Sequence, residues 1–191
     1  MSVLPIATVG NPELRIVAGE VSRAELALPE TQSFIDDLVE TMRAANGAGL
    51  AATQVLRHQR ICAVEVDNNP RYPYKPRVPL TILVNPVITV LDNDQFLNME
   101  GCLSVPGIRG GVLRNTRIHV KALDRHGAEI DEEIRGITAA TYQHEVDHLD
   151  GVLFLDRVAD SRTLTTWESF DRFHHDAFVD SVKALVAKHG M

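Results

Sequence analysis

The nine residues QHEVDHLDG, at 143–151, place two histidines and a glutamate within five positions. The surrounding segment 136–151 lacks proline, has glycine only at its two ends and repeats apolar residues at helical spacing, which predicts a helix. Residues four apart on a helix share a face, so His144 and His148 can direct their imidazoles at one point, with Glu145 beside them. This His-Glu-x-x-His arrangement is typical of two imidazoles that hold a divalent metal and a carboxylate that handles the protons of a metal-bound water.

A hydrolytic metal site usually has three protein ligands and one position left for water, so a third ligand must come from elsewhere. Downstream candidates are Glu168, His174 and His175, although the polar face of a last helix explains them at least as well. Upstream, Cys102 lies in the segment EGCLS, where the alternative interpretation is an inert buried cysteine. Cys62 in RICAVEV fits that alternative better, and an intracellular chain would keep both cysteines reduced.

Other elements must position these residues. An amphipathic helix is predicted at 29–47, because its apolar residues fall on one side with acidic residues opposite. Strands are predicted at 60–66, 80–91, 116–124 and 128–136. The last two form a hairpin through the turn sequence DRHG.

Two segments between these elements have unusual composition. The stretch GAGLAATQV at 47–55 is too rich in glycine to continue a helix and too apolar for an exposed loop, so we expect it to run close to other backbone in the interior. The stretch 67–79 has four prolines, which predicts an exposed loop.

These elements predict an α+β fold in which antiparallel β-sheets pack around a central metal-binding helix, with an N-terminal helix and a C-terminal helix at about 162–189. The length of 191 residues suits one domain, so we expect residues 1–191 to form a single catalytic domain.

Composition narrows the class of function. Hydrophobic residues make up 45% and charged residues 24%, which is typical of globular proteins. A net charge of -7 argues against direct nucleic-acid recognition. No segment approaches the roughly 20 apolar residues that span a bilayer, and the first residues do not resemble a secretion signal, so we expect a cytoplasmic protein without membrane contact.

Three motifs together resemble the signature of the peptide deformylase family: GAGLAATQ at 47–54, EGCLS at 100–104 and QHEVDH at 143–148. Their order and spacing agree with that family as well. The similarity extends from PIATVGNPELR, at 5–15, to about Arg157, and all three motifs together are far more specific than His-Glu-x-x-His alone.

The resemblance implies that Cys102, His144 and His148 are metal ligands, that Glu145 is the catalytic acid/base and that Gln54 is a hydrogen-bond donor in the active site. The implied substrate is the N-formyl group of a nascent chain that begins with formylmethionine, and the released product is formate. Cysteine with two histidines suits zinc on ligand preference, whereas the resemblance implies Fe²⁺ as the active metal, for which zinc or nickel can substitute.

The reaction needs donors for the oxygen that gains charge, and we expect the amide of Gln54 and the backbone N–H of Leu103 to supply them. Gly49 has no side chain to obstruct a peptide, so a substrate could lie beside it as an added strand. Arg109 could contact the substrate backbone or pair with an acid such as Asp147, and a surface arginine is the equal alternative.

A pocket for the methionine side chain is expected near the metal helix. Ile137, Ala140 and Thr141 lie seven, four and three positions before His144 and share its face, with Ala48 opposite. Packing in the core explains them nearly as well. Ala48 replaces a larger aliphatic residue common in the family, and Asn98 stands where an apolar residue is expected.

The leading hypothesis is a deformylase that acts on new chains during transient contact with the ribosome. An alternative enzyme is a metallopeptidase that uses the same helix on ordinary peptide bonds. A third hypothesis is a catalytically silent protein that binds nascent chains and carries a structural metal.

Overall fold

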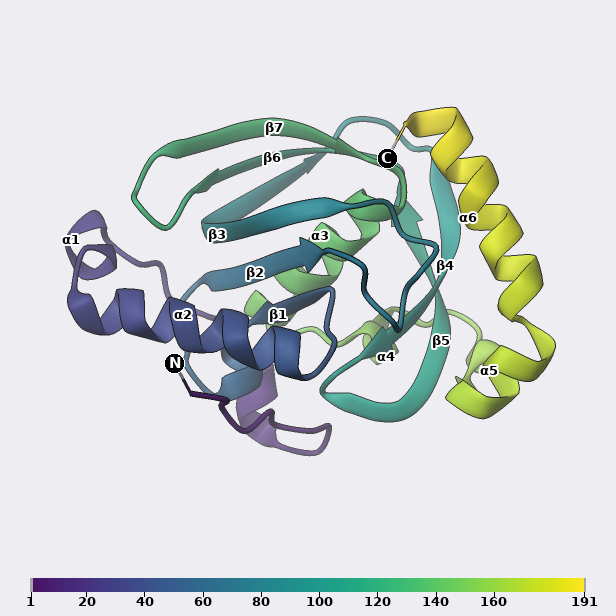
Figure 1. Cartoon of the computed structure of the whole chain (residues 1–191), viewed down its shortest axis with the longest axis horizontal. Helices are drawn as coiled ribbons and strands as arrows, with labels where there is room; N and C mark the ends of the chain where they lie inside the picture. The colour runs from purple at the N-terminus through teal and green to yellow at the C-terminus, as the bar shows by residue number, and fades with distance from the viewer. Residues whose placement is uncertain (1, 191) are drawn as a thin grey trace.

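The structure is a computed structural model that describes residues 2–190 of the chain. It contains two antiparallel β-sheets, and the helix α3 (Gly136–Leu149) packs against strands of both (Figure 1). Helices also lie near both ends of the chain, so the predicted α+β class is confirmed.

The larger sheet has five strands in the order β1-β2-β3-β6-β7. Its strands are β1 (Gly49–Ala51), β2 (Ile61–Val66), β3 (Val78–Val90), β6 (Arg117–Leu123) and β7 (Glu129–Arg135). The predicted hairpin between β6 and β7 is confirmed, because Asp124 accepts a backbone hydrogen bond from Gly127 and the φ of Gly127 is 82°. The strand β1 lies at one edge of the sheet and pairs only with β2, so its other edge carries no strand from the described residues.

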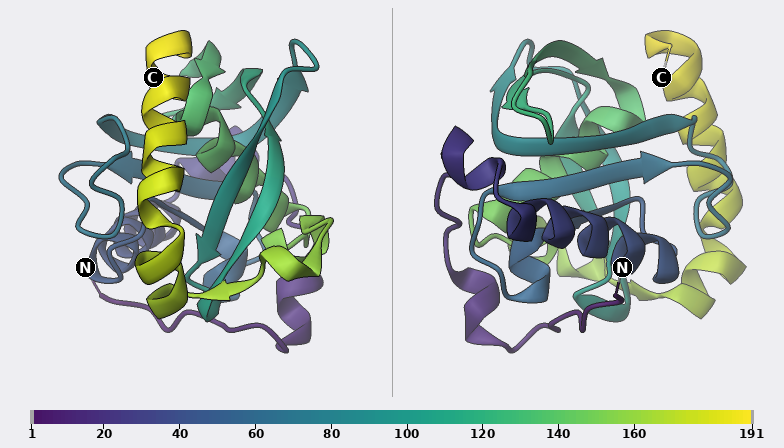
Figure 2. Two further views of the ribbon diagram at one scale, coloured as in Figure 1. Left: turned by 90° about the vertical axis from the view of Figure 1, so that its right-hand side faces the viewer. Right: turned by 60° about the vertical axis from the view of Figure 1, so that its left-hand side comes forward.

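The smaller sheet has the strand order β4-β5-β8. Its strands are β4 (Gln95–Cys102), β5 (Val105–Asn115) and β8 (Thr165–Thr166). A two-residue turn joins β4 to β5, and the long β4–β5 hairpin crosses the molecule beside the C-terminal helix (Figure 2). The turn brings Cys102, the last residue of β4, toward α3.

The helix α3 is buried on nearly every side. All of its residues except Gln143 and His144 are buried, which a surface helix with one apolar stripe could not achieve. Ala139 packs with β2 and β3 residues such as Val64 and Leu83, whereas Ile137 packs with aromatic residues of the C-terminal region. The predicted central helix therefore packs both against the larger sheet and against the C-terminal helices.

The N-terminal helix α2 (Pro29–Ala44) confirms the amphipathic pattern. Pro29 begins it, as expected for the first helical position, where no N–H is needed. Its apolar face, which includes Ile35, Leu38 and Met42, packs on Leu50 and other buried residues of the sheet. Short helices complete this part of the chain: η1 (Pro12–Arg15), α1 (Arg23–Leu26) and η2 (Ala52–Val55).

The C-terminal region differs from the single helix predicted at about 162–189. It contains η3 (Ser161–Thr163), the strand β8, α5 (Trp167–Phe173) and α6 (His175–His189), preceded by α4 (Phe154–Arg157). The Thr166 side chain caps the start of α5, and His174 departs from helical geometry with φ of −127°. The break at His174 lets Phe170 and Phe178 pack edge to face, 5.7 Å apart.

No helix within residues 2–190 has both the length and the apolar character needed to cross a membrane.

Candidate metal centre and active site

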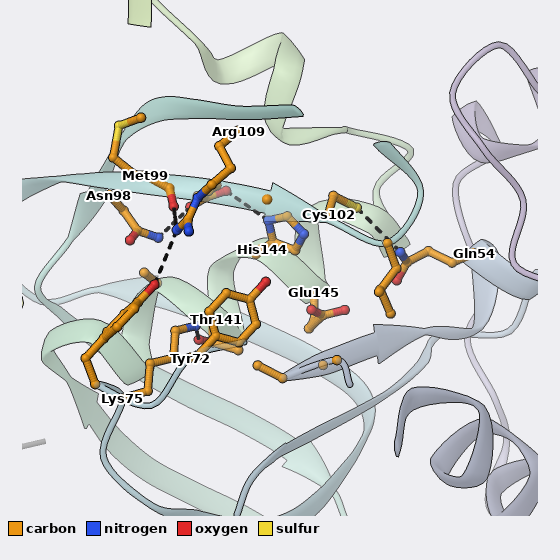
Figure 3. A pocket seen from close by; sticks show the side chains of 18 residues that line it. Gln54, Tyr72, Lys75, Asn98, Met99, Cys102, Arg109, Thr141, His144 and Glu145 are labelled. Carbon is orange, nitrogen blue, oxygen red and sulfur yellow. Dashed lines mark hydrogen bonds and ion pairs between the residues drawn. The ribbon is translucent and has the colours of Figure 1, made fainter. Parts of the chain in front are cut away.

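Three side chains from two elements converge at one point. Cys102 ends β4, while His144 and His148 lie one turn apart on α3, and their ligand atoms all fall within 4.8 Å of one another. The Sγ of Cys102 is 3.1 Å from Nε2 of His148. Figure 3 shows Cys102 and His144 beside Glu145 at this point. The two imidazoles face the cysteine because residues four apart share a side of the helix.

Charged groups behind the site orient His144. Its Nδ1 lies 2.8 Å from a carboxylate oxygen of Glu100, which accepts the hydrogen bond and leaves Nε2 free to act as a ligand. Arg114 donates two hydrogen bonds to Glu100, at 2.7 and 2.9 Å, and a third to Asp147 at 2.6 Å. Arg157, which is half-exposed, donates two further hydrogen bonds to Asp147 at the outer end of this network.

The charges around Cys102 favour its thiolate form. Burial alone would raise the pKa of the Cys102 thiol, but His148 and His144 outweigh it and hold that pKa well below its usual range. Burial alone would lower the pKa of His144, and the hydrogen bonds with Cys102 and Glu100 raise it instead. A thiolate is the form of cysteine that binds metals.

The donor set fits a divalent metal. At the usual Zn–S and Zn–N lengths of roughly 2.3 and 2.0–2.1 Å, tetrahedral ligands lie roughly 3.5 Å apart. Here the three ligand atoms lie within 4.8 Å of one another, and Sγ of Cys102 is 3.1 Å from Nε2 of His148. The downstream candidates Glu168, His174 and His175 are not part of the cluster, and His175 instead packs against the rings of Tyr74 and Phe170. One sulfur and two nitrogens thus remain as the ligands that the described residues offer.

Glu145 lies next to this cluster with an unused oxygen. Its Oε2 is buried and has no hydrogen-bond partner within the described chain, and burial raises the pKa of this carboxyl to about 6. The backbone of Gly49 on β1 approaches so closely that a Cβ there would lie 2.7 Å from Cγ of Glu145. The glycine therefore leaves room for this carboxylate, a reason that the sequence did not reveal.

Gln54 turns its amide toward the cysteine. Its Oε1 accepts a hydrogen bond from the backbone N–H of Ala51, and its Nε2 donates to Ser104 at 3.0 Å and to the sulfur of Cys102 at 3.6 Å. Leu103 follows Cys102 in the turn between β4 and β5 and lines the same cavity as Gln54. Both predicted donors therefore lie beside the candidate metal ligands.

A cavity of about 50 Å³ opens beside Cys102 and His144, two of the three candidate ligands. Its walls include the predicted residues Ala48, Gly49, Ala140 and Thr141, as well as Asn98. Ile137 does not line it, because that side chain points to the aromatic cluster around Phe170 under α6 and has no exposed surface. For Ile137 the core-packing alternative is the better one.

Arg109 lines the cavity, and the structure excludes two of the three predicted arrangements for it, whereas contact with the substrate backbone stays a prediction. It is 2% exposed, so it is no surface arginine, and Asp147 pairs with Arg114 and Arg157 instead. Its guanidinium donates to the backbone oxygen of Met99 and stacks on the ring of Phe170, 3.9 Å from the centroid. Aromatic faces replace a carboxylate as its partner because they stabilise a desolvated cation.

Sequence reasoning missed two groups of residues. The loop predicted at 67–79 lines the cavity with Tyr72, Tyr74 and Lys75, although its prolines suggested only an exposed connection. Figure 3 shows Tyr72 and Lys75 there. Glu100 and Arg114 were also missed. Glu100 lies two positions before Cys102 in the sequence. That short spacing from a candidate ligand was the one signal that could have identified Glu100 as part of the site.

A sequence profile of the polypeptide deformylase family matches residues 3–163. The chain belongs to this family. It is 47% identical over 164 residues to peptide deformylase 1 of Prochlorococcus marinus, covering 84% of this chain and 83% of the relative.

Solved structures agree with this assignment. A class I type b peptide deformylase from Acinetobacter baumannii, crystallised with Met-Ala-Ser bound, has a TM-score of 0.79 and 40% identity, covering 83% of this chain and 100% of that one. A peptide deformylase from Ehrlichia chaffeensis in complex with actinonin has a TM-score of 0.76 and 33% identity, covering 96% and 98%. Like other peptide deformylases, this enzyme is a metal-dependent hydrolase that removes the N-formyl group from the formylmethionine of newly made polypeptides and releases formate.

Proposed function

We propose that Cys102, His144 and His148 hold one divalent metal, beside which Glu145 transfers protons during hydrolysis of the formyl group. The observation that carries this assignment is the meeting of one sulfur and two nitrogens within 4.8 Å. The buried Glu145 oxygen without a partner supports it further, because a buried acceptor left unbonded is costly and indicates a functional use.

A divalent metal held here supplies Lewis acidity, which lowers the pKa of water and polarises the formyl oxygen. Glu145 accepts the proton of the attacking water and passes it to the departing amine. Its raised pKa suits both steps, because a group that titrates near neutral pH can take up and release a proton.

The formyl oxygen gains negative charge as its carbon becomes tetrahedral. The amide of Gln54 and the backbone N–H of Leu103 donate hydrogen bonds to that oxygen. Gln54 is already oriented for this role, because its Oε1 is tied to the backbone N–H of Ala51 and its NH₂ group faces the ligands.

The peptide itself lies along the free edge of β1 as an added strand, past the backbone of Gly49. Its first side chain enters the cavity between Ala48 and Thr141. The Met-Ala-Ser complex of the Acinetobacter baumannii relative supports a peptide of this kind as the occupant. Arg109 supports the wall of the cavity through Met99 and Tyr74.

The proposed native metal is Fe²⁺, which zinc or nickel can replace. A thiolate and two imidazoles accept all three metals, so availability decides which is bound. Iron beside the Cys102 thiolate makes the activity sensitive to oxygen.

We also propose that residues 1–191 act as a single catalytic domain in the cytoplasm, where chains beginning with formylmethionine are made. Contact with the ribosome is transient, because the net charge of -7 disfavours tight binding to RNA.

The decisive experiment is anaerobic reconstitution of the metal-free protein with Fe²⁺, Ni²⁺ and Zn²⁺ in turn, followed by measurement of formate release from formyl-Met-Ala-Ser. We expect release with each metal, fastest with iron. Cleavage of an unformylated peptide without formate release would instead identify a metallopeptidase.

Glu145→Gln tests the proton-transfer role. We expect this variant to bind metal normally and to lose turnover by about 10²- to 10⁴-fold, the usual contribution of general acid–base catalysis. Glu168→Gln, at an exposed position of α5, is the matched control and should keep full activity. Unchanged turnover in Glu145→Gln would contradict the proton-transfer role of this carboxylate.

A further inference from the structure

The cavity beside the metal ligands has an unexpectedly polar wall. Lys75, from the loop between β2 and β3, reaches into it and donates a hydrogen bond from Nζ to Oγ1 of Thr141 at 2.9 Å. Its Nζ also lies 4.7 Å from the centroid of the Tyr72 ring. Figure 3 shows Lys75 beside Thr141 and Tyr72, with Asn98 also at the cavity. An ammonium group thus lies where the first side chain of the peptide would enter.

The ammonium group of Lys75 has unused hydrogen-bonding capacity. It carries three N–H donors and only the bond to Thr141 uses one of them. No ion pair joins Lys75 to any carboxylate of residues 2–190. Two acids line the same cavity: Glu100 is already bonded to Arg114 and His144, and Glu145 makes no hydrogen bond or ion pair with Lys75 within residues 2–190. Two donors therefore remain for a molecule in the cavity.

A purely apolar side chain in the cavity would displace water from this cation and provide no hydrogen-bond acceptor to replace it, which costs free energy. An acceptor at the same place would gain a charge-assisted hydrogen bond, which is about twice as strong as a neutral one. The thioether sulfur of methionine is a weak acceptor, whereas the oxygen of methionine sulfoxide is a polar one. Norleucine, methionine and methionine sulfoxide carry CH₂, S and S=O at the δ position of otherwise similar side chains. The strength of the hydrogen-bond acceptor at that position thus increases along this series.

We propose that Lys75 determines the specificity of this cavity and selects first side chains with a hydrogen-bond acceptor at the δ position, the sulfoxide of oxidised formylmethionine above all. This inference rests on the proposed function, because it assumes that the cavity receives the first side chain. The consequence is that the enzyme also processes new chains whose first residue has been oxidised.

The test compares kcat/KM for formate release from three peptides: formyl-norleucyl-Ala-Ser, formyl-Met-Ala-Ser and its sulfoxide form. The informative quantity is the ratio of the sulfoxide value to the norleucine value. We expect Lys75→Met to lower this ratio at least tenfold, because it removes the donor but keeps a side chain of similar length. Lys121→Met is the matched control, since Lys121 lies in another hollow, beside Val87, and should leave the ratio unchanged.

A ratio that stays within twofold in Lys75→Met overturns the inference. The two proposals fail in different ways. If the proposed function is wrong, the native sequence releases no formate from any of the three peptides. If only the role of Lys75 is wrong, formate is released and the ratio does not move.

A second measurement needs no variant. Burial holds the pKa of Lys75 at about 8, so the ratio for the native sequence should fall as pH rises from 7 to 9.5. The other titratable groups facing Lys75 are Tyr72 of the same loop, Glu100 of β4, Arg109 of β5 and Glu145 of α3. Effects of pH on the shared chemical step cancel in the ratio. A flat ratio over this range also overturns the inference.

Discussion

At the scale of single residues, the site depends on one buried carboxylate. Glu100 accepts hydrogen bonds from both His144 and Arg114 and is itself buried. Burial alone would raise the pKa of Glu100, but Arg114 and His144 hold it well below its usual range, so the group stays charged. A charged partner behind a ligating histidine fixes the orientation of the ring and makes it a better ligand.

Glu100→Gln should therefore weaken metal binding. We expect a loss of 10- to 100-fold in affinity, as for other partners behind metal ligands, measured by competition with a chelator. Asp131→Asn is the matched control, because Asp131 also bonds a histidine, His119, but in a pair outside the site. Equal affinities in the two variants would show that Glu100 does not orient the ligand.

At the scale of elements, the active site forms where β1 meets α3. Gly49 on β1 and Glu145 on α3 occupy adjoining space, and no side chain fits between them. One edge of β1 pairs with β2, and its other edge pairs with no strand of residues 2–190. In the proposed function, the same strand therefore makes room for the carboxylate and offers backbone to the peptide. The position of β1 relative to α3 thus sets the geometry of the reaction.

Gly49→Ala tests this close approach. The added Cβ must displace the Glu145 carboxylate, and an error of about 1 Å in a catalytic group can cost about a hundredfold in rate. We expect a loss of that size in kcat with metal content unchanged. Gly19→Ala is the control, because its Cβ would lie at an ordinary 3.7 Å from the backbone oxygen of His58. Full activity in Gly49→Ala would contradict the arrangement.

At the scale of the whole molecule, α3 connects regions that are far apart in sequence. It packs on strands of the larger sheet, on β5 of the smaller one and on α6. Trp167 of α5 packs against the core cluster that contains residues of β2 and β3. These shared contacts predict that the described parts unfold together rather than one after another.

Chemical unfolding of the metal-bound protein tests that cooperativity. Trp167 is the only tryptophan of the chain and lies 4.5 Å from the guanidinium of Arg109, so its fluorescence reports the packing of the C-terminal region. We expect its transition to coincide with the loss of far-ultraviolet circular dichroism. A fluorescence change at lower denaturant would show that the C-terminal region is a separate unit.

The sequence alone was sufficient for the local features of the site. His144, Glu145 and His148 could be placed on one helical face because helix geometry depends only on spacing within a few residues. The amphipathic pattern of α2 and the alternation of β6 and β7 were readable for the same reason. Cys102 as third ligand needed the family resemblance, since residues alone left downstream alternatives open.

Only the tertiary structure decided the features that join distant parts of the chain. The bond from Lys75 to Thr141 spans 66 positions, and the one from Glu100 to His144 spans 44. The break at His174 and the burial of Ile137 likewise follow from aromatic packing between separate elements. Such contacts depend on which surfaces meet after folding, and periodicity within one segment carries no information about them.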